Sequence, residues 1–404
     1  MRYDLVVVGG GAAGLVAAIV AARTGARVLI LEKNAKLGKK ILATGNGRCN
    51  LGNDHWSLDN FVSHNIVLAR LILDQFDNQA AKHFFGQLGL VIVSEEGRWY
   101  PRSKQAVSVL TVFLSELTRL GVESAVSSPV HTIEVTSRGF TVHHGTGQSD
   151  GQRVLLTTGG LAAPTLGCTG DGYSLARALG HSIHAPAPAL VGLRLKSAYL
   201  KKLSGLRLTA EVTIPELGLT ERGEVIFTDY GISGIPIFDL SRAIGHRQGL
   251  TLRLKLAHEA ATESELLGFL DRYLRELSSK SPSDALAGYL PHQLCIPVLE
   301  ESGLEHKKCA RVLSRAEVGQ LGRQLWAWDF PIIALNTWEQ AQTTWGGIPL
   351  DEVDPATLNS KKQSGLSLAG EILDVHGRCG GYNLHWSFAS GYVAGQATAH
   401  CPLS

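Results

Sequence analysis

Three glycines near the start of the chain have the spacing of a diphosphate-binding turn. Gly9, Gly11 and Gly14 follow the apolar run 5–8 and precede an Ala-rich segment, 15–24, which we expect to be helical. The first glycine allows a tight turn, the second lets the backbone approach a diphosphate, and the third lets helix and strand pack closely. The phosphates would accept hydrogen bonds from free N–H groups at the positive end of that helix.

A carboxylate stands where the adenosine ribose of a dinucleotide would lie. The second apolar run, 26–31, ends in Glu32. An acid about 20 residues after the glycines can bind both ribose hydroxyls, and it disfavours a 2′-phosphate at this site. Strand, turn, helix, second strand and terminal acid together favour a dinucleotide site over a glycine turn that is only structural.

The elements around this turn indicate an α/β fold. Short β-rich runs alternate with helical patterns over residues 1–190, as in a doubly wound (Rossmann-like) parallel sheet. Amphipathic helices are expected over 66–88 and 106–121. Between 130 and 156, three runs alternate with period two, which predicts a β-meander.

The residue pattern of the chain changes three times after this region. It becomes β-rich from about residue 191 and helical from about 257, and it is Gly-rich again after about 340. We therefore predict a nucleotide-binding domain formed by 1–190 and 340–404. Inserted in it would be a β-rich, barrel-like domain (191–256) and a helical cap (257–339). This arrangement is more typical of flavoproteins than of simple dehydrogenases.

Composition disfavours several other classes of protein. The 38 basic and 36 acidic residues nearly balance, at +2, which does not indicate a nucleic-acid or membrane partner. No apolar run reaches the roughly 18 to 20 residues of a membrane span, and the first apolar stretch is the nucleotide-binding strand rather than a signal peptide. Six cysteines without a CxxC pair and fifteen histidines without HExxH predict neither a disulfide framework nor a metal site. We expect a cytoplasmic protein, monomeric by default.

Several further blocks occur together in this sequence. They are 36–50, which ends in TGNGRCN, and 158–172, 227–234, 346–348 and 369–383, the last ending in GGYN. In this combination the chain resembles the BaiN/RdsA (YhiN-like) family of FAD-dependent oxidoreductases, over residues 5 to 395. Two departures concern the inserted domain: Asp229 stands where His is expected, and Ile235 interrupts the usual Gly-Pro pair. They affect the details of substrate binding rather than the cofactor.

The resemblance implies a three-part architecture, a tightly but non-covalently held FAD, and reductive chemistry. Members of the family differ in substrate. Some are associated with reducing a uridine of large-subunit ribosomal RNA to dihydrouridine, and others with enone steps of bile-acid steroids.

Two motifs near the C-terminus could hold the redox half of FAD. In flavoproteins an acid placed like Glu371, after Gly370, binds a ribitol hydroxyl. The block 380–383 opens the last expected helix, 384–398, whose N-terminus could stabilise the negative charge of the reduced ring. The alternatives are an ordinary strand-end carboxylate and a Gly-rich loop with an Asn cap.

The block after the second strand is dense in Gly, Lys and Arg. Lys39 and Arg48 could contact phosphate or flavin oxygens, and Gly45 and Gly47 would let the backbone run beside the ring. For Lys39 and Lys40 a solvated basic loop is the alternative.

The predicted cofactor-binding residues fall into these blocks and their neighbours. They are Gly9, Gly11, Ala12, Ala13, Gly14, Glu32, Lys33, Gly38, Lys39, Thr44, Gly45, Asn46, Gly47, Arg48, Val130, Thr158, Gly159, Gly160, Gly370, Glu371, Asp374, Gly380, Gly381, Tyr382, Asn383 and Leu384.

Reduction of an activated C=C bond needs a placed acid as well as a hydride source. A thiol of ordinary pKa, roughly 8.5, is protonated at neutral pH. We therefore take Cys49 as a candidate proton donor, with Arg48 or Asn46 orienting the substrate. The alternative is a small buried side chain near the ring. Trp99 and Tyr100 could line the substrate pocket or fill the core.

Three functions remain open from the sequence. The first, an FAD oxidoreductase acting on ribosomal RNA, is narrowly favoured by resemblance, and five basic residues between 194 and 207 are compatible with it. The second is an FAD enzyme that reduces a small enone, and the third is a flavin-binding protein without turnover. No second strand–GxGxxG–helix unit is present in the sequence, so we expect NAD(P)H to dock only transiently as electron donor.

Overall fold

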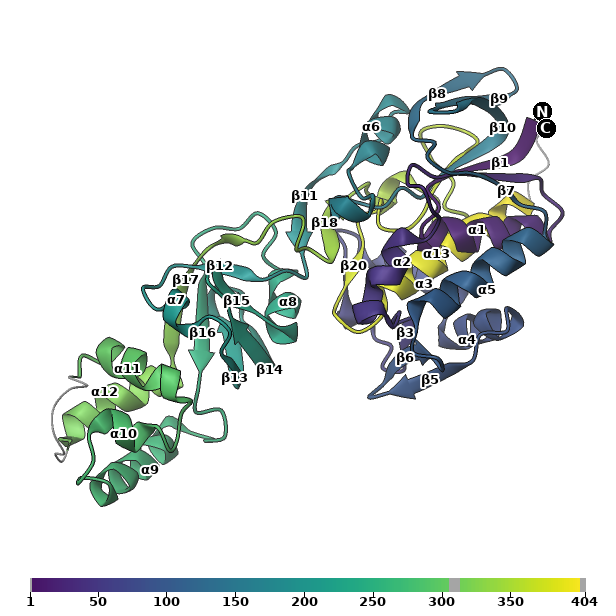
Figure 1. Cartoon of the computed structure of the whole chain (residues 1–404). Helices are drawn as coiled ribbons and strands as arrows, with labels where there is room; N and C mark the ends of the chain where they lie inside the picture. Colours follow the sequence, from purple (N-terminus) through teal and green to yellow (C-terminus); the bar gives the residue numbers. More distant parts are fainter. Residues whose placement is uncertain (1, 305–312, 400–404) are drawn as a thin grey trace. The chain divides into compact units, whose positions relative to one another are not determined.

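A computed structural model describes residues 2–304 and 313–399 of the chain (Figure 1). The chain divides into two compact units. The first joins the residues up to Ala189 to those from Trp338 onward, and the second is Leu190–Thr337. The sequence analysis placed these boundaries after residues 190 and 339.

The first unit contains a mixed sheet, seven-stranded within the described residues, in the order β7-β2-β1-β10-β9-β8, with β19 also paired to β10. Its strands are β1 (Arg2–Val8), β2 (Val28–Leu31), β7 (Glu123–Ala125), β8 (Val130–Thr136), β9 (Gly139–His144), β10 (Gly147–Leu156) and β19 (Leu366–Leu368). The strands β7, β2, β1, β10 and β19 run parallel, whereas the hairpin β8-β9 joins β10 antiparallel. The doubly wound core therefore carries the predicted meander at one edge.

Helix α1 (Ala12–Arg23) is buried on nearly all sides, from Ala13 to Ala22. It packs against α13 (Tyr382–Ala399) and α5 (Ala106–Arg119), as Figure 1 shows. A Cβ at Gly391 of α13 would lie 2.3 Å from the carbonyl oxygen of Ala13. This glycine therefore lets the last helix approach the first helix closely.

The segment 66–88, expected as one helix, is broken in the structure. It forms α3 (Ile66–Leu73), a 3-10 turn (Asp74–Phe76) and α4 (Asn78–Gln87). Asp77 has extended backbone angles, and its carboxylate accepts hydrogen bonds from the N–H groups of Gln79 and Ala80. The single-helix prediction was wrong because Asp77 acts as the N-cap of a second helix.

Shorter elements complete the first unit. They are α2 (Lys39–Ala43), α6 (Asp171–Ala178), β3 (Gly52–Asn53), β4 (Phe61–Val62), β5 (Ile92–Glu95), β6 (Arg98–Pro101), β11 (His184–Ala189), β18 (Thr343–Gly347) and β20 (His376–Gly377).

The second unit is built on a closed barrel in the order β12-β15-β14-β13-β16-β17. Its strands are β12 (Leu193–Leu195), β13 (Arg207–Ile214), β14 (Leu219–Phe227), β15 (Gly231–Ser233), β16 (Thr251–Lys255) and β17 (Trp328–Leu335). Its helices are α7 (Leu200–Leu203), α8 (Ile235–Ser241), α9 (Glu263–Glu276), α10 (Pro282–Leu286), α11 (His292–Glu301) and α12 (Arg315–Trp326).

Strand β17 corrects the predicted extent of the helical cap. It falls within 257–339, which we expected to be helical, yet it pairs with β16 and β12 and closes the barrel. The last strand of the barrel therefore follows the helical segment in sequence. Among the described residues, none of the helices combines the length and apolar character that crossing a bilayer would need.

Candidate functional site

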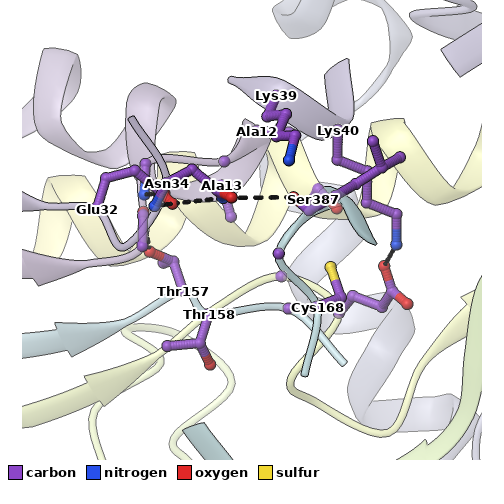
Figure 2. A pocket seen from close by; sticks show the side chains of 18 of the residues that line it. Ala12, Ala13, Glu32, Asn34, Lys39, Lys40, Thr157, Thr158, Cys168 and Ser387 are labelled. Carbon is purple, nitrogen blue, oxygen red and sulfur yellow. Dashed lines mark hydrogen bonds and ion pairs between the residues drawn. The ribbon is translucent and has the colours of Figure 1, made fainter. Parts of the chain in front are cut away.

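A cavity that is partly open to solvent lies in the first unit (Figure 2). It extends from the turn between β1 and α1 past the end of β2 to Glu371 and the start of α13. Fifteen of the predicted cofactor-binding residues line it: Gly9, Gly11, Ala12, Ala13, Glu32, Lys33, Lys39, Thr44, Val130, Thr158, Gly159, Gly370, Glu371, Asn383 and Leu384.

The glycine turn has the geometry expected for a diphosphate cradle. Gly9 has a φ of +111°, and a Cβ on Gly14 would lie 2.0 Å from the carbonyl oxygen of Gly9. A Cβ on Gly11, in contrast, would meet nothing within 4 Å and would project into open space. Gly11 precedes α1 without a side-chain cap, so the first-turn N–H groups of this helix are available to an anion.

The carboxylate of Glu32 is held in place at the end of β2. One oxygen accepts a hydrogen bond from Gly10 N at 2.8 Å, and the other accepts from Asn34 N at 2.8 Å and Asn34 Nδ2 at 2.7 Å. Figure 2 shows Glu32 and Asn34 together near the glycine turn. Glu32 is only 8% exposed, and these hydrogen bonds fix its carboxylate in the cavity lining.

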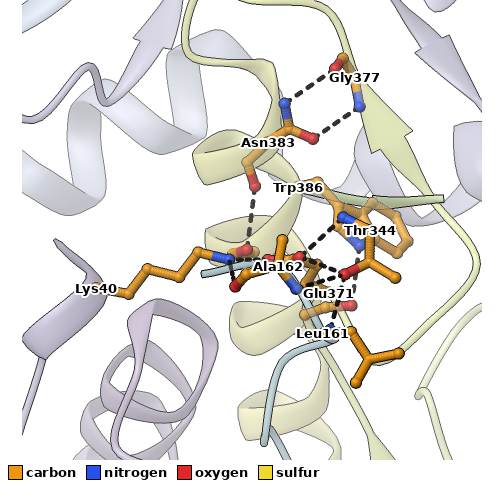
Figure 3. Close-up of polar contacts among 10 residues, drawn as sticks. Lys40, Leu161, Ala162, Thr344, Glu371, Gly377, Asn383 and Trp386 are labelled. Atoms are coloured by element: carbon orange, nitrogen blue, oxygen red, sulfur yellow. Dashed lines mark hydrogen bonds and ion pairs between the residues drawn. The ribbon is translucent and has the colours of Figure 1, made fainter. Parts of the chain in front are cut away.

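An ion pair marks the other end of the cavity. Lys40 Nζ lies 2.7 Å from a carboxylate oxygen of Glu371, whose other oxygen accepts hydrogen bonds from Thr344 N and Oγ1, each at 3.0 Å (Figure 3). Burial by itself would lower the pKa of Lys40, but the charges of Glu371 and Cys168 and the hydrogen bonds to them together raise that pKa above its usual value. Lys40 therefore stays protonated in the cavity.

The start of α13 is held by side-chain hydrogen bonds. The side chain of Asn383 accepts from Gly377 N at 2.8 Å and donates to Gly377 O at 2.9 Å (Figure 3). Gly370 N donates to Ser390 Oγ, and Trp386 Nε1 donates to Gly370 O. These bonds hold the loop before α13 against the helix, where Asn383 and Leu384 line the cavity.

The sequence matches the family described as HI0933-like protein Rossmann domain over residues 3–397. The chain belongs to this family. It is 38% identical to the 3-dehydro-bile acid delta(4,6)-reductase of Clostridium scindens, covering 98% of this chain and 99% of that protein. It is 25% identical to the ribosomal RNA dihydrouridine synthase of Escherichia coli, covering 98% of each chain. These matches confirm the resemblance recognised from the motifs.

A solved structure shares the fold at low sequence identity. The 3-ketosteroid delta1-dehydrogenase of Sterolibacterium denitrificans, in complex with 1,4-androstadiene-3,17-dione, superimposes with a TM-score of 0.52 at 12% identity, covering 98% of this chain and 99% of that one. The comparison therefore extends over the whole chain of this HI0933-like protein.

Eleven predicted cofactor residues of this family member do not line the cavity. They are Gly14, Gly38, Gly45, Asn46, Gly47, Arg48, Gly160, Asp374, Gly380, Gly381 and Tyr382. Gly38 faces the side chain of Leu110, and a Cβ on Gly381 would lie 2.5 Å from Gly52 O. The Tyr382 hydroxyl donates to His55 O at 2.9 Å. For these positions a direct contact with the cofactor is not supported.

The block that ends in TGNGRCN folds away from the cavity after Thr44. Gly45 and Asn46 adopt left-handed backbone angles, and the guanidinium of Arg48 lies 4.6 Å from the centre of the Tyr100 ring. Trp99 and Tyr100 are buried and fill the core. Neither Asn46 nor Arg48 lies in the cavity lining, so the cavity gives no support to their predicted role in orienting a substrate.

Cys49 is entirely buried, with a φ of +60°, and it does not line the cavity. Burial raises the pKa of its thiol to about 11. The prediction that Cys49 donates a proton to the substrate is therefore not supported, because the thiol is enclosed by protein. Its placement fits the alternative, a small side chain packed in the core.

Other lining residues were not in the predicted set. They are Val8, Gly10, Leu31, Asn34, Lys40, Ile41, Ser128, Thr157, Leu166, Gly167, Cys168, Asp171, Leu175, Gln342 and Ser387. Several of them adjoin predicted positions, and Asn34 follows Glu32 by two residues. Lys40 adjoins the predicted Lys39, but its partner Glu371 lies 331 residues away, so no local pattern reveals this ion pair.

Proposed function

We propose that this HI0933-like protein is an FAD-dependent oxidoreductase that reduces a C=C bond conjugated to a carbonyl group. One observation carries the proposal. A single cavity joins a diphosphate-type glycine turn and a fixed ribose-type carboxylate to a partly buried cation and the start of a helix. That order of features suits a cofactor with a dinucleotide at one end and a charge-accepting ring at the other.

Different residues of the cavity would bind different parts of the cofactor. The N–H groups at the start of α1 would bind the diphosphate, Glu32 the adenosine ribose, and Glu371 a ribitol hydroxyl. When bound, FAD supplies the hydride, and we propose NAD(P)H as the transient source of electrons. Because NAD(P)H is a cytoplasmic reductant, we place the reaction in the cytoplasm.

Lys40 and the start of α13 would govern charge at the redox end. Lys40 carries a positive charge inside the cavity, and the N-terminus of α13 adds the positive end of a helix dipole. Both lower the free energy of negative charge on a ring bound there. The chain thereby favours the reduced state, which is the one that delivers the hydride.

We propose a small, largely apolar enone as the substrate. The chain is 38% identical over its length to a bile acid reductase, against 25% and 26% to two ribosomal RNA dihydrouridine synthases. This difference supports the enone over the ribosomal RNA that the motifs alone narrowly favoured.

Ribosomal RNA remains the second candidate because of one surface on the second unit. Five basic side chains between β12 and the start of β13 are exposed: Arg194, Lys196, Lys201, Lys202 and Arg207. Exposed cations of this density could contact phosphates, and such binding would weaken steeply with added salt. A flavin-binding protein without turnover is the third possibility.

The test is anaerobic mixing of the reduced holoenzyme with a conjugated 3-keto steroid, followed by the flavin absorbance and product mass. We expect flavin reoxidation and a product heavier by two hydrogens. In parallel, nucleoside analysis compares dihydrouridine in ribosomal RNA from cells with and without the gene. Loss of dihydrouridine without the gene, with no steroid turnover, would overturn the enone in favour of RNA. No turnover of either substrate would leave only flavin binding.

A further inference from the structure

Two histidines and an aspartate from three separate segments converge in the first unit, on residues that do not line the cavity. His64 follows β4, His184 is the first residue of β11, and Asp374 precedes β20. His64 Nδ1 lies 2.5 Å and His184 Nδ1 lies 2.9 Å from the same oxygen, Asp374 Oδ2. One carboxylate oxygen thus faces two imidazole nitrogens.

The surroundings fix the carboxylate and leave the imidazoles accessible. The side chain of Asp374 is 3% exposed, whereas those of His64 and His184 are 47% and 36% exposed. Asp374 N donates to Ile348 O at 2.9 Å, which anchors the backbone that carries the carboxylate. The ring centroids of Trp345 and His64 lie 5.2 Å apart, with an angle of 66° between the ring planes. The carboxylate of the cluster is therefore buried, whereas its two imidazoles are accessible to solvent.

We infer that His64, His184 and Asp374 bind a divalent transition-metal ion. Their ligand atoms all lie within 4.8 Å of one another, so one ion can contact all three after a small spreading of the side chains. Two imidazole nitrogens and one carboxylate oxygen suit Zn²⁺ or Fe²⁺ better than the all-oxygen cations Mg²⁺ and Ca²⁺. The ion would lie between the two Nδ1 atoms and Asp374 Oδ2, and the exposed side would keep coordination positions for water.

Sequence spacing could not reveal this group. Motifs such as HExxH place two ligands on one helix, whereas these three residues are 120 and 190 positions apart (64 to 184, and 184 to 374). The strand pairing of His184 with Gly347 and the loop between Glu371 and β20 bring them together. This inference is independent of the proposed reaction, because Asp374 faces the histidines instead of the cavity.

The competing interpretation is a metal-free hydrogen-bonded group, in which the Nδ1–H groups of the two imidazoles donate to Asp374. The distances are short enough for such bonds. The two interpretations differ in whether the group retains an ion, so metal content separates them.

The experiment uses the full-length flavin-loaded protein, equilibrated with Zn²⁺ against a chelating dye, and with Co²⁺ as a spectroscopic probe. We expect one tight Zn²⁺ per chain and a visible Co²⁺ absorption band of a histidine-ligated site. Loss of a partner that only orients a metal ligand weakens binding about 10- to 100-fold, so His64→Ala and His184→Ala should weaken it at least as much. Asp374→Asn, which keeps the side-chain shape, should do the same.

His83→Ala is the matched control, since His83 is an exposed histidine on α4 that contacts Gln87 on the same helix. It should leave Zn²⁺ binding unchanged. Thermal melting and flavin content, measured for every variant, separate loss of a ligand from loss of folding. Absence of retained Zn²⁺ in the wild type, or Zn²⁺ binding that survives both histidine substitutions in folded protein, would overturn the metal site.

Discussion

The two ends of the cavity are assembled in different ways. At the adenosine end, Gly9, Gly11 and Glu32 come from one continuous strand–helix–strand unit. At the redox end, Lys40 meets Glu371 across 331 residues, and Glu371 is held by Thr344. A site formed by neighbouring residues leaves a recognisable spacing in the sequence, whereas a site formed by tertiary contacts does not.

The largest effects are expected in the glycine turn, where one substitution should impair folding and another should impair FAD binding. In Gly14→Ala the added Cβ would lie 2.0 Å from a backbone oxygen, so α1 must move and we expect a loss of more than about 3 kcal/mol in unfolding free energy. In Gly11→Ala the Cβ enters open space, so the fold should survive while FAD binding falls by at least about 100-fold. Denaturant unfolding and FAD titration of both variants measure these effects.

The same single methyl group is added in both variants, so each controls for the other. Equal destabilisation of the two variants would contradict separate packing and binding roles. So would normal FAD affinity in Gly11→Ala.

Lowering the pH should destabilise the folded protein through His385 in α13. Burial lowers the pKa of His385 to about 4, below the ordinary value of about 6.5. As pH falls from 6.5 to 4, the unfolded chain takes up this proton and the folded chain does not. Stability should therefore decrease by up to about 3 kcal/mol over this window. Unfolding free energies at several pH values test this.

The variant His385→Asn separates the contribution of His385 to the pH dependence of stability from that of the carboxylates that also titrate in this range. Its stability should be lower at pH 7 but should fall less between pH 6.5 and 4. An unchanged pH slope in His385→Asn would exclude His385 as the source.

Exchanging one cation tests the redox end directly. Lys40→Met removes the charge beside Glu371 and should lower the midpoint potential of bound flavin by about 30 to 60 mV, equivalent to about 1 to 3 kcal/mol for two electrons. Lys39→Met is the control, because Lys39 Nζ contacts Thr165 O and has no carboxylate partner within the described ion pairs. A larger shift of the midpoint potential in Lys39→Met than in Lys40→Met would contradict our assignment of Lys40 as the cation that stabilises the reduced flavin.

The smallest effect is expected at Cys49. Because its thiol is enclosed and lies outside the cavity lining, Cys49→Ala should change the rate of substrate reduction less than about threefold, within about 1 kcal/mol of activation free energy. Anaerobic reoxidation of the reduced variant measures this rate. A drop of several orders of magnitude would restore the thiol as proton donor.

These contrasts show what the sequence could and could not predict. The turn at Gly9–Gly14 and the acid at Glu32 were predictable because their chemistry depends on spacing along one βαβ unit. For Lys40 the sequence left a solvated basic loop open as the alternative, and its partner Glu371 is too remote in sequence to decide between the two. Gly381 was assigned to the cofactor, yet its lack of a side chain serves close packing on Gly52.

The secondary structure follows the same division. The meander 130–156 and helix α5 follow local periodicity closely. The break at Asp77 depends on one capping side chain, and β17 is a strand because it closes the barrel beside β16. Both depend on interactions that hydrophobic period alone does not reveal.

The most direct test of the central claim is equilibrium titration of the deflavinated wild-type protein with FAD, followed by flavin fluorescence and absorbance. We predict one FAD per chain with submicromolar affinity, and competition by ADP, which would occupy the Gly11 and Glu32 end alone. A folded protein that is colourless after incubation with excess FAD and removal of the unbound FAD would contradict a flavin site in this cavity.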